Sequence, residues 1–171
     1  MRLIAALVLL WPVLALAEAR PPEAIAGFWQ TEGDEAVIQI RVEGHDFPGT
    51  IVWLAEDHYP ADDPRGMGGQ IVVDRDNPDP AKRNRALIGL TLLKNLDYHV
   101  SSNDPDNAEA RWINGRIYDS ERGKWYDCNL WLADADHLKV HGYIGVPLLG
   151  KTTTWTRVAD PARQAPVPPG P

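Results

Sequence analysis

The chain has a single cysteine, few basic residues and only one long hydrophobic run, at its start. Of its 171 residues, 17 are Lys or Arg and 24 are Asp or Glu, so the formal net charge is −7. This acidic balance argues against binding to nucleic acid or to an anionic membrane through a basic face. The lone Cys128 cannot form an internal disulfide, so the fold must depend on its hydrophobic core. Seven tryptophans supply large apolar surfaces for that core.

The hydrophobic run at the start has the layout of a secretion signal. Met1 and Arg2 give a positive start, Leu3 to Leu16 are almost all apolar, and Ala15-Leu16-Ala17 is a small-x-small cleavage pattern. An apolar run of about 14 residues is shorter than the roughly 20 that span a bilayer. We therefore expect residues 1–17 to be a signal peptide and the mature chain to be exported to the periplasm or secreted.

The sequence also lacks the common catalytic and cofactor motifs. It has no Gly-x-Ser-x-Gly, no His-Glu-x-x-His, no P-loop and no dinucleotide fingerprint. The Asp-rich segment 74–85 departs from the calcium-loop pattern, with Pro78 at position five and Arg85 at position twelve. His137 and His141 have no Cys or Glu near them to complete a zinc pattern. We expect no cofactor and no metal, and an enzyme is the weakest of the three functional hypotheses below.

What the sequence does contain is a repeated alternation of apolar and polar residues. Ala36, Ile38, Ile40 and Val42 alternate with polar or outward positions, as in a half-buried strand. Further strands are expected at 50–54, 86–93, 111–113, 115–118, 124–132, 137–144 and 151–158, with turn signals between several of them. Many short strands without a long amphipathic helix indicate an all-β fold, a small antiparallel up-and-down β-barrel. An immunoglobulin-like sandwich is the alternative, although the paired cysteines typical of that fold are missing.

Three segments lie outside this alternation. Residues 18–26 are expected to be an exposed lead-in, and residues 159–171, with five prolines, a disordered tail. The folded domain is therefore predicted to span residues 27–158. Within it, residues 55–85 are polar and too long for a hairpin turn, so they form one long inserted loop, and loops of that length are often functional.

Motifs along the whole domain resemble those of a known family. Gly27-Phe28-Trp29 and Trp155-Thr156-Arg157 are similar to the lipocalin or calycin signature, in which an Arg lies over the Trp that plugs the closed end of a barrel. The other matching segments are Asp74-x-x-Asn77-x-x-Pro80-x-x-Arg83-x-Arg85, Trp112-x-x-Gly115-x-Ile117-Tyr118-Asp119, Gly123-Lys124-x-Tyr126-x-Cys128, Leu138-x-Val140-x-Gly142-Tyr143-x-Gly145 and Leu149-Gly150-x-Thr152-x-Thr154. Together they resemble a family of secreted bacterial proteins, a domain of unknown function described as lipocalin-like. This resemblance implies the barrel fold, the exported location and a structural pair of Trp29 and Arg157, but no reaction.

Five residues are candidates for contact with a ligand. Arg83 and Arg85 point to the same side of an extended chain, so they are expected to meet an acidic head group at the barrel mouth, or else a partner Asp within the fold. Tyr118, Tyr126 and Trp131 would supply aromatic walls. Cys128 is expected to be a small buried core residue.

Besides an enzyme, the sequence is compatible with two other functions. The first is a periplasmic lipocalin-like module that binds a lipid or another small apolar or amphipathic ligand. The alternative is a structural or interaction protein of the cell envelope, with a packed barrel interior and no ligand, that acts through a surface patch or as a homodimer.

Overall fold

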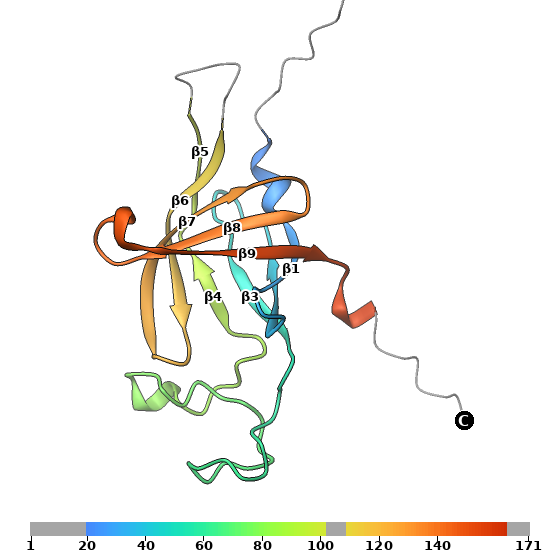
Figure 1. Ribbon diagram of the computed structural model, residues 1–171, viewed down its shortest axis with the longest axis vertical. Helices are drawn as coiled ribbons and strands as arrows, with labels where there is room; N and C mark the ends of the chain where they lie inside the picture. The colour runs from blue at the N-terminus through green and yellow to red at the C-terminus, as the bar shows by residue number, and fades with distance from the viewer. Residues whose placement is uncertain (1–19, 102–108, 164–171) are drawn as a thin grey trace, which may run out of the picture.

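The structure, a computed structural model, describes residues 20–101 and 109–163, and its strands form one antiparallel sheet (Figure 1). Helical structure within these residues is limited to short 3-10 turns. The strands are β1 (Gly27–Gln30), β2 (Ala36–Ile40), β3 (Gly49–Leu54), β4 (Thr91–Lys94), β5 (Asp97–Val100), β6 (Ala110–Asp119), β7 (Lys124–Leu132), β8 (His137–Tyr143) and β9 (Lys151–Val158). The 3-10 turns are η1 (Pro22–Ile25), η2 (Pro80–Lys82), η4 (Pro147–Leu149) and η5 (Pro161–Arg163).

The sheet closes on itself. Strands β1 to β4 pair in sequence order, as do β6 to β9. Strand β9 pairs with β1, and β4 pairs with β6 through Leu93 opposite Ile117, which completes the ring. Strands β4 and β5 are two parts of one strand, since both pair with β6 and only a break around Asn95, with φ of 60°, separates them. The result is a closed eight-stranded antiparallel barrel, so the predicted all-β up-and-down barrel is confirmed.

One end of the barrel is packed shut by large side chains. Trp29 and Trp112 are fully buried, and Phe47 meets Trp112 edge-on with ring centroids 6.2 Å apart. The η1 turn lies across this end: Trp29 Nε1 donates to the Ile25 carbonyl at 2.8 Å, and Ile25 is completely buried. Residues 18–26 were expected to be an exposed lead-in, but Ile25 in the η1 turn is buried against the closed end.

The connections at the other end are longer. Because neighbouring strands run antiparallel, residues 31–35, 55–90, 120–123 and 144–150 all lie at the same end of the barrel. The 55–90 connection extends below the strands in Figure 1. The expected strand at 86–93 is found only from Thr91, because the residues before it fold back onto the loop: Asp74 N donates to the Arg85 carbonyl and Leu87 N to the Val72 carbonyl. This end is the mouth of the barrel.

The two ends of the chain fall partly outside the described residues. The expected signal peptide, residues 1–17, lies outside them, as does most of the predicted disordered tail. The tail's first part differs from that expectation, because Pro161–Arg163 forms the η5 turn. Among the described residues no helix is both long enough and apolar enough to cross a membrane.

Candidate ligand-binding cavity

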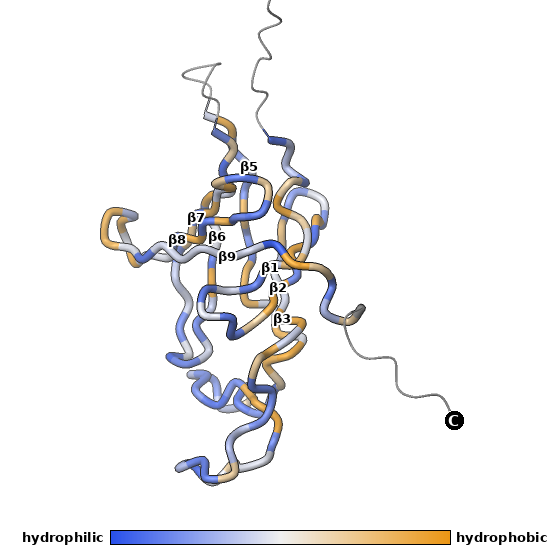
Figure 2. The backbone as a smooth tube through the Cα atoms, turned by 45° about the vertical axis from the view of Figure 1, so that its right-hand side comes forward, coloured by the Kyte–Doolittle hydropathy of each residue, from blue (hydrophilic) through white to orange (hydrophobic). Residues whose placement is uncertain are grey.

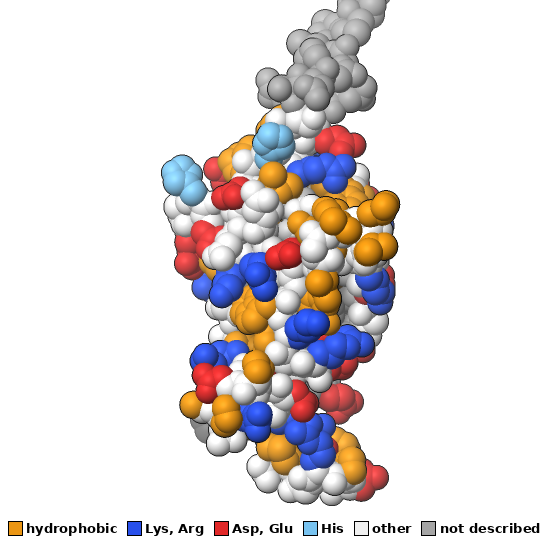
Figure 3. Space-filling model, turned by 90° about the vertical axis from the view of Figure 1, so that its left-hand side faces the viewer, with side chains coloured by type: hydrophobic (Ala, Val, Ile, Leu, Met, Phe, Trp, Pro, Cys, Tyr) orange, Lys and Arg blue, Asp and Glu red, His pale blue; other side chains and the backbone are white. Residues whose placement is uncertain are grey.

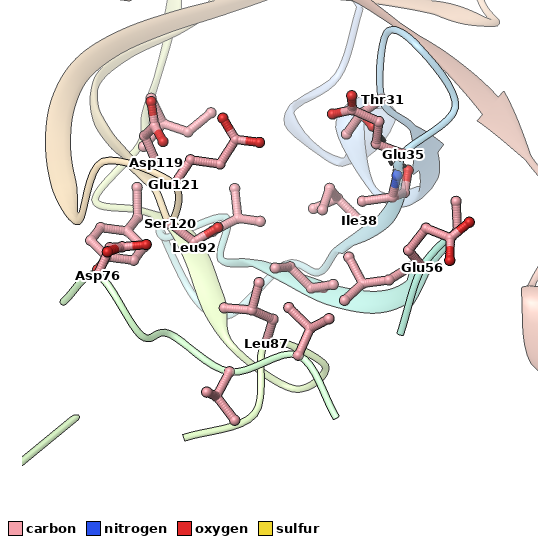
Figure 4. A pocket seen from close by; sticks show the side chains of 18 of the residues that line it. Thr31, Glu35, Ile38, Glu56, Asp76, Leu87, Leu92, Asp119, Ser120 and Glu121 are labelled. Carbon is pink, nitrogen blue, oxygen red and sulfur yellow. Dashed lines mark hydrogen bonds between the residues drawn. The ribbon is translucent and has the colours of Figure 1, made fainter. Parts of the chain in front are cut away.

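A cavity of about 880 Å³ lies at the mouth end of the barrel, between the strands and the 55–90 connection (Figure 4). Its inner wall is aliphatic and aromatic. The apolar lining side chains come from β2, β3, β4, β6, β9 and the long connection: Ala36, Ile38, Ile51, Leu54, Ala55, Val72, Val73, Leu87, Leu92, Ile117 and Trp155. Volumes of roughly 300–1,000 Å³ with mostly apolar walls are typical of small-molecule sites.

Strand alternation places these side chains inside. On β9, Thr153 and the buried Trp155 line the cavity, whereas the exposed Thr156 does not. On β2, Ala36 and Ile38 line the cavity, whereas Gln39, which lies between the buried Ile38 and Ile40, does not. The same period of two that predicts the strands therefore decides which residues a ligand would touch.

Tyr118 lines the cavity and anchors the long connection to β6. Its hydroxyl donates to Asp74 Oδ1 at 2.8 Å and accepts from Asn77 Nδ2 at 2.9 Å. Asp74 is fully buried and also accepts from Arg85 Nη2 at 2.7 Å and Nε at 2.8 Å. Burial and the hydrogen bond to Asp74 raise the pKa of Tyr118 to about 12, so this phenol stays neutral over a wide pH range.

A close backbone approach holds the same connection against the β6–β7 turn. A Cβ atom at Gly123, where φ is +60°, would lie 1.9 Å from the Asp76 carbonyl oxygen. Only glycine fits this position, both for its positive φ and for the contact. The floor of the mouth is thus positioned by contacts from Asp76 and Asn77 to the β6–β7 hairpin.

The mouth itself is lined mainly by acidic side chains. Five carboxylates and one guanidinium line the cavity: Glu35, Glu56, Asp76, Asp119, Glu121 and Arg75. Arg75 lies 4.2 Å from the Tyr59 ring centroid and donates to Asp63 Oδ1 at 2.8 Å. That hydrogen bond lowers the pKa of Asp63, whose side chain is almost fully buried.

The structure places Arg83 and Arg85 away from the cavity lining. Arg85 binds Asp74, and Arg83 Nε donates to the Asn77 carbonyl at 2.7 Å. The sequence left two possible partners for these arginines, an acidic head group of a ligand or an Asp within the fold. For Arg85 the structure shows the second, Asp74. Neither Arg83 nor Arg85 is therefore placed to meet the expected acidic head group at this mouth.

Tyr126 and Trp131 also lie outside the lining, so Tyr118 alone of the five candidates contributes to it. Lys124 Nζ lies 5.8 Å from the Tyr126 ring centroid, and the Arg111 guanidinium carbon lies 4.9 Å from that of Trp131. Sequence reasoning missed the carboxylates at the mouth because they come from three separate turns. The position of Glu35 and Glu121 beside turn signals was the one hint available.

The Trp29–Arg157 pair is found at the closed end. The guanidinium carbon of Arg157 lies 4.1 Å from the Trp29 ring centroid, and its nitrogens donate to the carbonyls of Ala24, Ala26 and Ala135, each at 2.8 Å. Cys128 is fully buried in the core, and burial raises the pKa of its thiol to about 12. Such a thiol is not a ready nucleophile at neutral pH.

No group of three or more His, Cys, Asp or Glu side chains in the described part of the chain is arranged to hold a metal ion. The mouth carboxylates are therefore spread too widely to share one small ion. What they can provide is a negative potential at the entrance of an apolar cavity.

An up-and-down barrel with one packed end, one open end and a Trp–Arg pair at its base defines a lipocalin-like protein. In agreement, the structure is similar to that of protein HP1028 from Helicobacter pylori, described as belonging to the lipocalin family, with a TM-score of 0.62 and 21% identity over 82% of this chain and 86% of that one. The chain belongs to the bacterial family described as "Uncharacterized protein conserved in bacteria (DUF2147)", whose model matches residues 27–157. Comparison with curated proteins gives no match.

Proposed function

We propose that this protein is a binding module of the bacterial cell envelope that takes one small apolar or amphipathic molecule into the mouth of its barrel. The observation that carries the proposal is the cavity of about 880 Å³ with its aliphatic inner wall. Burial of apolar ligand surface there is favourable by about 25 cal/mol per Å². The envelope location follows from the expected signal peptide.

Blocking the cavity should abolish binding of a neutral apolar probe such as N-phenyl-1-naphthylamine. Thr153 lines the cavity, so Thr153→Trp places an indole in the ligand's volume. Probe fluorescence should rise saturably with the wild type and remain at the buffer level with the variant.

The matched control is Thr156→Trp, which adds the same indole to the same strand at an exposed position that does not line the cavity. It should bind the probe as the wild type does. Equal binding by the wild type and Thr153→Trp would mean that the probe lies elsewhere and would contradict the proposal.

A second candidate function rests on the β8–β9 loop, residues 144–150. It has no charged residue, and its exposed side chains are aliphatic, with Leu148 91% and Leu149 78% exposed. Figure 2 shows the loop projecting from the barrel with a hydrophobic tip, and Figure 3 shows the side from which it projects, where hydrophobic side chains lie exposed next to Lys and Arg. An exposed apolar patch of this kind marks an interaction site. Leu and Val are under-represented among protein–protein hot spots, so an aliphatic patch favours a lipid partner over a protein partner. The partner that fits best is therefore the hydrocarbon boundary of a lipid bilayer.

The double variant Leu148→Ser and Leu149→Ser should lose at least half of the binding to neutral phosphatidylcholine vesicles in a flotation assay. Two fewer buried aliphatic side chains weaken insertion by about 1.5–3 kcal/mol each. Ile71→Ser with Ile88→Ser, two exposed aliphatic residues of the long connection, is the control. Failure of the wild type to float, or equal loss in both double variants, would exclude this candidate.

A further inference from the structure

The charges around the cavity mouth are strongly one-sided. Five lining residues are acidic and one is basic, so the lining carries a formal charge of 1 − 5 = −4. The single basic residue, Arg75, pairs with Asp63 outside the lining at 2.8 Å and, at 3.9 Å, with Asp76 within the lining. A cleft with charges of one sign and low-dielectric walls concentrates the opposite charge at its entrance.

Two of the five carboxylates already have a basic partner. Asp119 accepts from Arg122 Nη1 at 2.6 Å, and Asp76 accepts from Arg65 Nη1 at 2.8 Å. The charges of these two carboxylates are largely compensated by their partners. They do not account for the whole negative potential.

The other three carboxylates have no such partner. Glu35, Glu56 and Glu121 form no ion pair and no side-chain hydrogen bond with any residue that the structure describes. They belong to the turn before β2, the start of the long connection and the β6–β7 turn. Three separate elements thus bring carboxylates without an ion-pair partner to one opening.

Their arrangement matches an elongated ligand with one polar end. In Figure 4, Glu121 and Glu35 lie on opposite sides of the opening, and the aliphatic Ile38, Leu87 and Leu92 lie between and below them. An apolar body would contact the aliphatic wall, and a head group would remain at the level of the carboxylates. Within the described residues no three acidic groups are arranged to hold a metal ion, whereas a larger organic cation could contact carboxylates on both sides of the opening.

We infer that the ligand of this cavity is a cationic amphiphile: an aliphatic or aromatic body inside the barrel with a protonated amine or quaternary ammonium head between Glu35 and Glu121. This inference rests on the proposed function, since it names the chemistry of the ligand for the same cavity. Charge-assisted hydrogen bonds from an ammonium group to carboxylates are shorter and stronger than neutral ones. An anionic amphiphile of the same length would meet uncompensated like charges instead.

The test compares three probes with one decyl chain and different heads: decylamine, decanol and decanoate. Displacement of the neutral fluorescent probe near neutral pH and low salt gives the three dissociation constants. Decylammonium should bind at least about 10-fold more tightly than decanoate, which corresponds to about 1.4 kcal/mol. Added salt should shrink this ratio, because the mouth carboxylates are exposed to solvent.

The double variant Glu35→Gln with Glu121→Gln should lower the ratio of decanoate to decylammonium dissociation constants several-fold towards 1, with Glu56 still in place, and leave decanol binding unchanged. Glu43→Gln with Glu109→Gln is the control: it removes the same charge from two residues near the closed end, which pair with Arg41 and Arg111. This control should keep the wild-type ratio.

The outcomes separate the two proposals. If none of the three probes binds, the proposed binding function itself fails. If all three bind with equal affinity, or decanoate binds best, the cavity binds amphiphiles and the inference of a cationic head is overturned. The inference is also overturned if both double variants lower the ratio equally, because the preference would then reflect overall charge.

Discussion

Replacing Trp29 by alanine should lower the free energy of unfolding by about 3–5 kcal/mol, the range for removing a large aromatic side chain from a core. Trp29 is fully buried, stacks against the Arg157 guanidinium and donates its indole N–H to the Ile25 carbonyl. The substitution would leave a cavity in the closed end and release the η1 turn that covers it. Small domains are stable by only about 5–15 kcal/mol, so this loss removes a large part of the total.

Chemical denaturation followed by far-UV circular dichroism measures this loss. The control is Trp53→Ala, which removes the same side chain from β3, where it is 38% exposed. It should cost no more than about 1 kcal/mol. If Trp29→Ala does not fold at all, Trp29→Phe keeps an aromatic ring, removes the N–H donor and shortens the side chain, at an expected cost of about 1–3 kcal/mol. Equal losses for Trp29→Ala and Trp53→Ala would show that the closed end does not carry the stability assigned to it.

The closed end is also where sequence reasoning succeeded best. The period-two alternation and the two end motifs around Trp29 and Arg157 depend on local chemistry that a strand imposes everywhere. Strand β7 illustrates this: Cys128 was expected to be a buried core residue, and it is fully buried, as is Leu130 two positions further along the same face. The barrel could be predicted because each strand carries its own evidence.

The mouth could not be predicted in the same way, because it depends on contacts between distant residues. Asp74 and Tyr118 are 44 positions apart, and Asp74 and Arg85 are 11 apart within a segment without alternation. Once Arg85 is bound to Asp74, the charge available to a ligand changes from positive to negative. The strand expected at 86–93 is shortened for the same reason, since the backbone of Arg85 and Leu87 bonds to the loop.

The acidic mouth is likewise a product of topology. Glu35, Glu56 and Glu121 are unremarkable surface residues in the sequence, and nothing local marks them as neighbours. The alternation of chain direction in an up-and-down barrel brings their three turns to one end. The strand order alone therefore determines which turns meet at the mouth, whereas the pairing of each charge depends on contacts between side chains.

Replacing Asp74 by alanine is expected to lower the free energy of unfolding by about 3 kcal/mol, the lower end of the range for breaking a buried ion pair. Its carboxylate is fully buried and accepts hydrogen bonds from Arg85, Tyr118 and Asn77. Without it, the Tyr118 hydroxyl and the Asn77 amide lose their acceptor in a buried site, which costs about 1–3 kcal/mol for each group. The lower end applies because the Arg85 side chain is 37% exposed and can be solvated.

The matched control is Asp76→Ala, two residues further along. Asp76 pairs with Arg65 at the surface, where the two side chains are 35% and 47% exposed. Exposed pairs contribute about 0–1 kcal/mol, so this variant should denature almost as the wild type does. If Asp76→Ala costs as much as Asp74→Ala, the stability lies in the acidic segment as a whole and not in the buried Asp74 cluster.

High pH gives an independent readout of the same Asp74 variant. In the folded protein the pKa of Tyr118 is raised to about 12 from an ordinary value of 10.0, first by burial and then by the hydrogen bond to Asp74. A raised folded-state pKa means that the neutral phenol contributes stability that is complete below about pH 10 and is lost as the pH rises towards 12. Asp74→Ala removes the contribution of the carboxylate to this pKa shift. The stability of the variant should therefore fall less than that of the wild type between pH 10 and 12. The difference in unfolding free energy between wild type and Asp74→Ala should therefore narrow between pH 10 and 12, and a constant difference would show that Tyr118 and Asp74 are not coupled.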